Sequence, residues 1–433
     1  MILADGRLYP SSEHSHILDT LEETICHTRM NETLDTETVI QALDRLGQCV
    51  AAGEFDALIG SLGLGKAAED MMSSVELLRQ GYLEKKVMTE LGRDFFVPTR
   101  QEATFGLRRI ETRAMPLGTL FHIAAGNMDF LPAYTVAEGL LTGNVNLLKL
   151  PQADSGVTVL ALQKLIELEP KLRHFIYVFD TPSDDLVTMK RLAEMADGIV
   201  VWGGEAAVTA VRSLAPVGAK LIEWGHRLSF AYLSGDWQSK PDELTALAGH
   251  IVRTEQLLCS SCQTIYLDTE DMEDIRNFCR VFLPYLEAAR RKSPLDDIGA
   301  AAEMTLQHYS AELESFLTGK RAERQTICRG FQCSLTACED SELVLSDLFG
   351  RVPVKRLPYD RMLPVLRRQK GYLQTAGLLC DEADRARLTD RLIRSGVNRV
   401  TSVGGMSDVF VGESHDGEYS LRRYVRMVNV EEC

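Results

Sequence analysis

Hydrophobic residues recur along the chain with two different periodicities. In the first hundred residues they recur at intervals of three and four, most clearly over 36–51 and 69–92, which predicts amphipathic helices. After about residue 113 the pattern changes to short apolar and β-branched runs that alternate with helical stretches. The predicted strands are 119–124, 145–150, 174–179, 198–202 and 220–223. The helices predicted between them are 132–141, 155–168, 184–195 and 205–213.

This alternation indicates an α/β protein with a doubly wound, mostly parallel sheet. In such sheets ligands bind beside the carboxyl ends of the strands, so the residues that follow each strand are the candidates for a site. Those candidates are Gly126-Asn127, Lys149 with Pro151-Gln152, Asp180-Thr181-Pro182, Gly203-Gly204 and Glu223-Trp224-Gly225.

Composition narrows the classes of partner. The chain has 433 residues, of which 45% are hydrophobic, and a formal net charge of -15. An acidic protein is repelled by nucleic acid and by anionic membrane surfaces, so a small-molecule substrate is the better expectation. The sequence contains no apolar run near the ~20 residues of a membrane span and no signal-peptide pattern at its start. Ten cysteines without framework spacing favour a reducing compartment, so we expect a cytoplasmic protein.

Cys259 is the candidate nucleophile. It lies between a polar turn and a strand-like run that includes the apolar residues 265–267. A thiolate is strongly nucleophilic and suits the making and breaking of thioesters. A cysteine beside two leucines also fits a small buried hydrophobe, and this stretch alone does not separate the two interpretations.

Two other motifs allow alternative interpretations. Cys259 and Cys262 have the C-x-x-C spacing of redox and zinc sites, but no second pair at ligand spacing completes a tetrahedral site, so we expect no metal. Residues 63–68 fit the loose dinucleotide pattern G-x-G-x-x-A. No convincing buried strand precedes this motif, which argues against a phosphate-binding loop.

The order of the candidate residues resembles that of the aldehyde dehydrogenase superfamily. The members of this series, in chain order, are Asn127, Lys149, Gly203-Gly204, Glu223, Cys259 and 347–350 (Asp-Leu-Phe-Gly). The resemblance implies a nucleotide-binding domain at 1–230 that includes a helical N-terminal region, and a catalytic domain at 231–400. It further implies an oligomerisation or return segment at 401–433.

Within the superfamily, the chain is most similar to long-chain acyl-CoA reductases of the LuxC type, the reductase component of bacterial fatty acid reductase complexes. The stretches that carry this resemblance are 125–127, 139–144, 259–261, 396–399 and 416–417. Two positions depart from the pattern. Cys262 stands where that family has proline, and Asp347 stands where the wider superfamily has glutamate.

The resemblance implies a role for each candidate. Cys259 would carry the acyl group, and Asn127 would donate to the developing oxyanion, although a turn residue is the alternative for Asn127. Glu223 would move protons. The cofactor would be held by Lys149, Gln152, Gly203, Gly204, Asp347 and Phe349. Plain structural interpretations exist here too: a surface lysine for Lys149, a tight turn for the glycines and a core aromatic for Phe349.

The implied reaction is the reduction of a fatty acyl thioester, carried by coenzyme A or by a protein, to an aldehyde. Gln152 stands where many superfamily members have an acidic residue that repels a 2′-phosphate, so the expected cofactor is NADPH. Two alternatives stay open: an aldehyde dehydrogenase that forms acids with Glu223 as base, and a thiol acyl carrier without redox chemistry.

Two further expectations concern assembly and the choice of thiol. Segments 105–113 and 419–430 alternate apolar and basic residues and could pair as strands across a subunit interface, which predicts a homo-oligomer. An acyl-transferring enzyme is a further candidate partner. The number of residues between Cys259 and the apolar strand matches the superfamily spacing, so the acyl group is expected on Cys259 rather than on Cys262.

Overall fold

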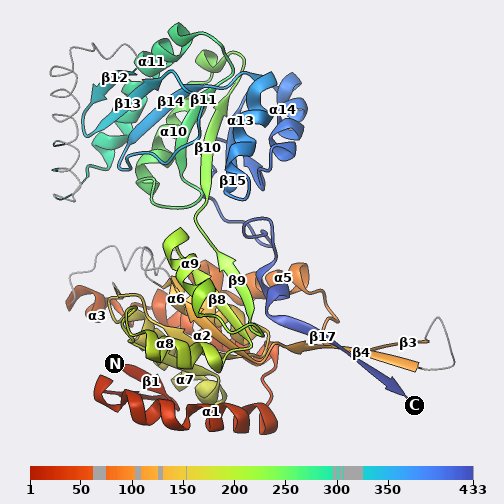
Figure 1. The fold of residues 1–433 in the computed structure, drawn as a ribbon. Helices are drawn as coiled ribbons and strands as arrows, with labels where there is room; N and C mark the ends of the chain where they lie inside the picture. Colours follow the sequence, from red (N-terminus) through yellow and green to blue (C-terminus); the bar gives the residue numbers. More distant parts are fainter. Residues whose placement is uncertain are drawn as a thin grey trace. The chain divides into compact units, whose positions relative to one another are not determined.

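The computed structural model describes residues 1–61, 75–102, 109–124, 130–152, 154–295 and 325–432, with the single positions Gly299, Ala302 and Leu306. The chain forms two compact units (Figure 1). The first comprises Met1–Gly225 and Phe410–Cys433, and the second comprises His226–Val409. In the described part, no helix combines the length and the apolar character that a membrane crossing requires.

The first unit is built on a seven-stranded sheet of order β2-β1-β7-β6-β5-β8-β9. Its parallel strands are β5 (Thr119–Ile123), β6 (Val145–Lys149), β7 (Ile176–Phe179), β8 (Gly198–Trp202) and β9 (Lys220–Trp224). The crossover helices are α6 (Leu131–Leu141), α7 (Val157–Leu168), α8 (Leu186–Glu194) and α9 (Glu205–Leu214). The predicted doubly wound α/β fold is confirmed. The hairpin β1 (Ile2–Ala4) and β2 (Arg7–Tyr9) extends the sheet antiparallel to β7.

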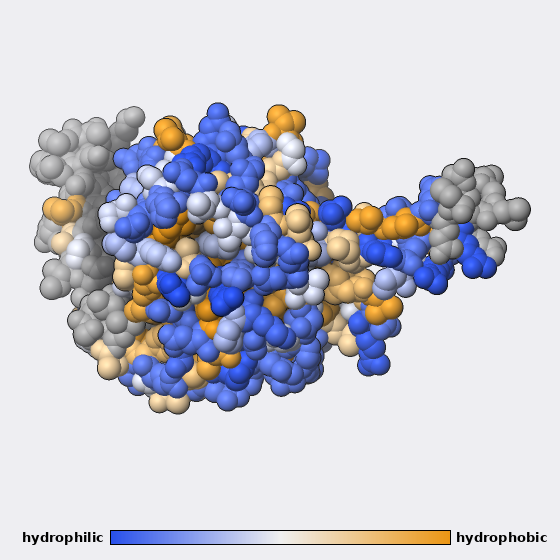
Figure 2. Space-filling view, turned by 90° about the horizontal axis from the view of Figure 1, so that it is seen from below, coloured by the Kyte–Doolittle hydropathy of each residue, from blue (hydrophilic) through white to orange (hydrophobic). Residues whose placement is uncertain are grey.

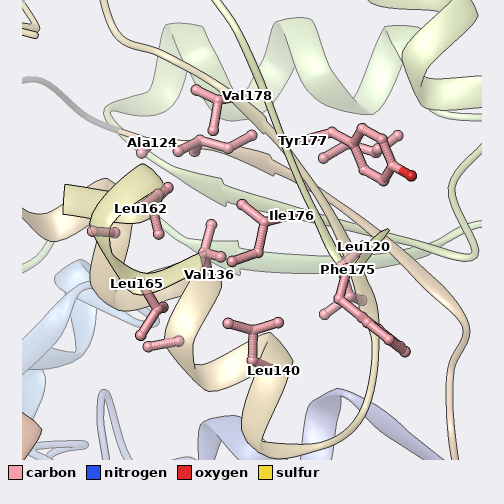
Figure 3. Close-up of a cluster of buried hydrophobic side chains, with 14 of the residues drawn as sticks. Leu120, Ala124, Val136, Leu140, Leu162, Leu165, Phe175, Ile176, Tyr177 and Val178 are labelled. Carbon is pink, nitrogen blue, oxygen red and sulfur yellow. The ribbon is translucent and has the colours of Figure 1, made fainter. Parts of the chain in front are cut away.

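The core of this unit explains why its strands read as continuous apolar runs. Every residue of β6 and β7 is buried, since helices cover both faces of a parallel sheet. Figure 3 shows Val136 and Leu140 of α6 and Leu162 and Leu165 of α7 gathered around Ile176 of β7. Burial of one such side chain stabilises the fold by about 1.5–3 kcal/mol.

The helices α1 (His14–Asn31), α2 (Thr36–Ala51), α3 (Asp56–Ser61) and α5 (Gln80–Glu90) precede this sheet. Helix α2 coincides with the predicted helix 36–51, and it packs against α6 and α7. Its first turn is capped by the Asp35 carboxylate, which accepts from the Thr38 N–H at 2.8 Å. Part of the predicted helix 69–92 and the whole of motif 63–68 lie outside the described residues.

The C-terminal segment returns to the first unit through a buried polar cluster. Lys86 of α5 donates to Glu90 at 2.5 Å and lies 3.1 Å from Glu138 of α6, while Ser420 donates to Glu138 at 2.6 Å. Ser420 begins α15 (Ser420–Arg423). Because a buried ammonium requires paired carboxylates, this cluster ties three segments that are distant in sequence to one another.

Beyond α15, the tail forms a three-stranded sheet of order β17-β4-β3 that projects as an arm (Figure 1). Strand β17 (Val425–Glu432) pairs antiparallel with β4 (Arg109–Pro116) of the same chain, and β4 pairs with β3 (Thr99–Glu102). The expectation that these two segments pair as strands is confirmed, here within one chain, and burial of the arm across a subunit interface stays a prediction. Residues 105–108 of that expectation lie outside the described part. Figure 2 shows hydrophobic and hydrophilic residues side by side on the arm.

The second unit has a seven-stranded sheet of order β12-β13-β14-β11-β10-β15-β16. Its strands are β10 (Leu228–Leu233), β11 (Cys262–Leu267), β12 (Gln325–Gly330), β13 (Cys333–Cys338), β14 (Arg351–Arg356), β15 (Leu373–Leu379) and β16 (Arg399–Thr401). Helices α10 (Pro241–Thr254) and α11 (Met272–Lys292) contribute to one apolar layer, and α13 (Met362–Leu366) and α14 (Glu382–Arg394) contribute to another. All neighbouring strands are parallel except β12 and β13.

Candidate functional site

Cys259 lies in the turn between α10 and β11, which we call the Cys259 turn (residues 255–261). The turn opens with two residues in the left-handed region, Glu255 (φ 47°) and Gln256 (φ 61°). The Cys259 side chain is exposed. Its carbonyl accepts from the Ser229 hydroxyl at 2.6 Å, and the neighbouring Ser260 hydroxyl is 2.8 Å from that of Ser407. These two hydrogen bonds hold the backbone of the turn on two sides, while the Cys259 side chain is exposed.

Cys262 has the opposite environment. It is the first residue of β11 and is 0% exposed. Burial raises the pKa of its thiol to about 12, so it stays protonated at neutral pH. Its N–H donates to Nε2 of the buried His250 at 3.2 Å. A neutral thiol inside the sheet is a weak nucleophile and a weak redox partner for Cys259.

The predicted Asp347–Phe349 motif lies directly against the Cys259 turn. Leu348 (φ 62°), Phe349 (φ 53°) and Gly350 (φ 82°) are consecutive left-handed residues in a stretch that we call the 346–350 loop. The Phe349 N–H donates to the Glu255 carbonyl at 3.1 Å. Asp347 is exposed and Phe349 is half-buried, so neither is a core residue. The structure therefore brings Cys259, Asp347 and Phe349 to one region of the second unit.

A buried ion pair packs against both the Cys259 turn and the 346–350 loop. Arg290 of α11 is 0% exposed and donates twice to the Glu255 carboxylate, at 2.5 and 2.6 Å. A Cβ on Gly350 would meet the same guanidinium at 3.1 Å. Arg290 therefore packs under both the Cys259 turn and the 346–350 loop. No local pattern in the sequence singled it out.

The first unit contains a cavity of about 540 Å³ at the carboxyl ends of β6 and β7. Gln152 lines this cavity together with Asp154, Asp180 and Ser183. Lys149 is only 4% exposed and reaches the lining through a 2.8 Å hydrogen bond to the Ser183 hydroxyl. Burial lowers the pKa of Lys149. A cavity of this size at the strand ends, with both apolar and polar lining residues, fits the adenosine half of a dinucleotide.

Gly203 and Gly204 connect β8 to α9. Gly204 is the N-cap of α9 and has no side chain to cap its first N–H groups. A Cβ on Gly203 would lie 3.0 Å from the Ala207 side chain, which explains a glycine at that position. Exposed N–H groups at the start of a ten-residue helix favour an anionic group, as a dinucleotide phosphate would supply.

Glu223 of β9 is engaged by a cation that sequence reasoning missed. Arg212 of α9 donates to both carboxylate oxygens, at 2.6 and 2.7 Å. This hydrogen-bonded charge lowers the pKa of Glu223. A carboxylate stabilised in its ionised form accepts protons less readily, and it is therefore a weaker general base than an unpaired glutamate.

The predicted site residues divide between the two units. Cys259, Asp347 and Phe349 belong to the second unit. Lys149, Gln152, Gly203, Gly204 and Glu223 belong to the first. Asn127 lies outside the described residues. Among the described residues, no group of three or more His, Cys, Asp or Glu side chains is arranged to hold a metal ion.

Solved structures with the same architecture are aldehyde dehydrogenases. The chain superimposes on lactaldehyde dehydrogenase from Escherichia coli with a TM-score of 0.68 and 14% identity, covering 98% of this chain and 92% of that one. Aldehyde dehydrogenase 21 from Physcomitrella patens gives a TM-score of 0.69 with 11% identity, covering 98% of this chain and 91% of that one. At these identities the likeness establishes the class of fold, which confirms the predicted superfamily architecture.

The match to a protein family is more specific than the match to a fold. Residues 32–427 match the family model of acyl-CoA reductase (LuxC), and the chain belongs to this family. It is 24% identical to long-chain acyl-protein thioester reductase 2 of Photobacterium leiognathi over 74% of this chain. It spans only 65% of the length of that relative. The Vibrio harveyi long-chain acyl-protein thioester reductase is 23% identical over 95% of this chain and 86% of its own length. The predicted LuxC-type resemblance is confirmed.

The buried His250 makes the stability of the second unit depend on pH. Burial lowers the pKa of His250 from 6.5 to about 4, so the unfolded chain binds a proton between these values and the folded chain does not. We expect the free energy of unfolding to fall as pH drops from about 6.5 to about 4, with His250 contributing roughly 2–3 kcal/mol. His250→Gln keeps an acceptor for the Cys262 N–H and should flatten this decline in urea titrations. The exposed His27 provides the control, and equal slopes for His27→Gln and His250→Gln would contradict the assignment.

Proposed function

We propose that this protein reduces a long-chain acyl thioester to an aldehyde with a nicotinamide cofactor, through an acyl group held on Cys259. The observation that carries the proposal is an exposed thiol in a pinned turn beside the Asp347–Phe349 motif. Membership of the acyl-CoA reductase family and the names of the matched relatives, which are acyl-protein thioester reductases, support the substrate class.

In the proposed reaction the Cys259 thiolate attacks the carbonyl carbon of the acyl thioester, a new carbon–sulfur bond forms, and the carrier leaves as a thiolate that takes up a proton. The Asn127 amide and the Cys259 N–H are the proposed donors to the oxyanion. When bound, the cofactor supplies the hydride that converts the enzyme thioester to the aldehyde and frees the Cys259 thiolate. Asp347 would hold the nicotinamide ribose, with Phe349 beside the ring.

The fit of the chain to a dinucleotide rests on separate features of the first unit. Gln152 and the Lys149–Ser183 pair would contact the adenosine end in the 540 Å³ cavity. The uncapped N–H groups after Gly204 would receive a phosphate. Lys149 would add a positive charge close to the ribose.

The Arg212–Glu223 pair favours reduction over the alternative, an aldehyde dehydrogenase that forms acids. Hydrolysis of an acyl-enzyme requires a base that activates water, and the ion pair holds Glu223 in its ionised, less basic form. We propose that Glu223 has a secondary role in proton transfer. Rates with acyl-CoA and NADPH should exceed rates with aldehyde and NAD under matched conditions, and the reverse order would support the dehydrogenase.

The choice of thiol gives a direct test of the mechanism. Cys259→Ala should abolish both acylation by labelled acyl-CoA and aldehyde formation, because it removes the exposed nucleophile. Cys262→Ala, the matched control three residues away, should keep a hydroxylamine-sensitive adduct and substantial activity, because its thiol is buried and protonated. Mass spectrometry of the trapped intermediate would refute the mechanism by finding the acyl group on Cys262, or on neither thiol.

We further propose NADPH as the preferred cofactor. Gln152 is neutral where many superfamily members have a carboxylate that would repel a 2′-phosphate. Of the three carboxylates that line the cavity, Asp154, Asp180 and Asp184, Asp180 forms an ion pair with the N-terminal ammonium of Met1. Gln152→Glu should lower kcat/KM for NADPH about tenfold relative to NADH, which is ~1.4 kcal/mol. Gln238→Glu, an exposed position in the second unit, is the charge-matched control. Wild-type turnover that is equal or better with NADH would contradict the preference.

We also propose an oligomeric state and a cellular compartment for this protein. The arm formed by β3, β4 and β17 exposes Met115, Met427 and Val430, which supports burial against a second copy. We propose that the protein is a homo-oligomer. We also propose that it acts in the cytoplasm, where its ten cysteines stay reduced. An acyl-transferring enzyme is the proposed partner that donates the acyl group. Sedimentation at micromolar concentration should give a mass above one chain, and Met427→Glu should lower it. A wild-type monomer would refute the oligomer.

A further inference from the structure

Two buried glutamines join the Cys259 turn to the 346–350 loop. Gln256 is 1% exposed, and its side-chain amide uses both ends. Its Nε2 donates to the Cys262 carbonyl at 3.0 Å, and its Oε1 accepts from the Gly350 N–H at 3.0 Å. One side chain therefore links the base of the turn to the end of the loop.

Gln263 continues this connection from β11. It is 3% exposed, and its Nε2 donates to the Gln256 carbonyl at 2.8 Å. Its Oε1 accepts from both the N–H and the hydroxyl of Ser346, at 3.2 and 2.8 Å. The hydrogen bonds of the two amides, which we call the amide bridge, are connected through the backbone of Gln256 and extend from Cys262 to the first residue of the 346–350 loop.

The backbone on both sides of the amide bridge is held in an uncommon conformation. Four residues other than glycine have positive φ there: Glu255 (47°), Gln256 (61°), Leu348 (62°) and Phe349 (53°). Such conformations persist only where the surroundings hold them, and they concentrate at functional sites. Water does not replace the hydrogen bonds of a buried amide. The amide bridge therefore fixes the position of the Cys259 turn relative to the 346–350 loop.

We infer that Gln256 and Gln263 are positioning residues that set the separation between the Cys259 thiol and the loop that bears Asp347 and Phe349. This inference rests on the proposed function, because the alignment matters only if an acyl group on Cys259 meets a hydride donor held by that loop. A misplacement of about 1 Å between reacting groups can cost roughly a hundredfold in rate. Two residues outside the reacting groups would thus control the reduction step.

The first test needs neither substrate nor cofactor. Gln263→Met breaks the amide bridge, and Ser346→Ala weakens it by removing the shorter of its two bonds to Gln263, since the Ser346 N–H bond remains. The second-order rate of iodoacetamide alkylation at Cys259 is measured by peptide mass spectrometry. Each variant should change this rate about threefold or more, and the double variant should add little, because both changes remove the same connection. Gln374→Met removes a buried amide from β15 of the same sheet and is the control, with an expected rate within about twofold of the wild type.

The second test separates positioning from general loss of structure. With acyl-CoA alone, Gln263→Met and Ser346→Ala should change the rate of Cys259 acylation by about the same factor as the rate of alkylation, because both rates report the reactivity of the thiol. With saturating NADPH, their kcat should fall about 10- to 100-fold, because only the hydride step depends on the alignment. Equal losses in both steps, or alkylation rates that match the wild type or change additively, would overturn the inference. A wild type that forms no adduct on Cys259 would refute the proposed function and leave the alkylation test valid.

Discussion

The buried ion pair between Arg290 and Glu255 is the interaction on which the region around Cys259 depends. The guanidinium is 0% exposed, and it holds a carboxylate on a residue with φ 47°. Removing one partner of such a pair leaves a buried charge uncompensated and costs about 3–5 kcal/mol in general. Gly350 packs so closely on the same guanidinium that a side chain there would crowd it. A single arginine thus supports the turn with the thiol and the loop with the cofactor motif.

The start of β11 explains why two cysteines three residues apart differ so completely. Cys262 enters the sheet opposite Ser229 of β10, whereas Cys259 precedes the strand and faces solvent. The same Ser229 donates its hydroxyl to the Cys259 carbonyl, so one side chain marks the boundary between strand and turn. A C-x-x-C spacing that would suit redox chemistry in a flexible loop is here divided between a buried and an exposed environment.

In the first unit, the geometry of the parallel sheet places the residues proposed to bind the dinucleotide at one edge. Parallel strands end at one edge, and the crossover helices begin there with N–H groups that lack partners within the helix. The sequence departs from a plain scaffold at this edge, where Gln152, Gly203 and Gly204 follow the strands. Glu223 forms an ion pair with Arg212. This pairing makes Glu223 a weaker general base for the hydrolysis that would form an acid.

The hydrophobic pattern by itself determined the helices and the parallel strands of the first unit, because burial of a strand or of one helix face requires a periodicity that is visible locally. The order of motifs along the chain likewise placed Cys259, Asp347 and Phe349 among the candidate site residues. Only the tertiary structure decided which residues support them. Ser346 meets Gln263 across 83 residues, and Val428 of β17 pairs with Arg113 of β4 across 315 residues. Such contacts follow from how sheets and helices pack. A local sequence pattern does not encode them, because a residue such as Ser346 or Gln263, taken alone, looks like any other polar residue.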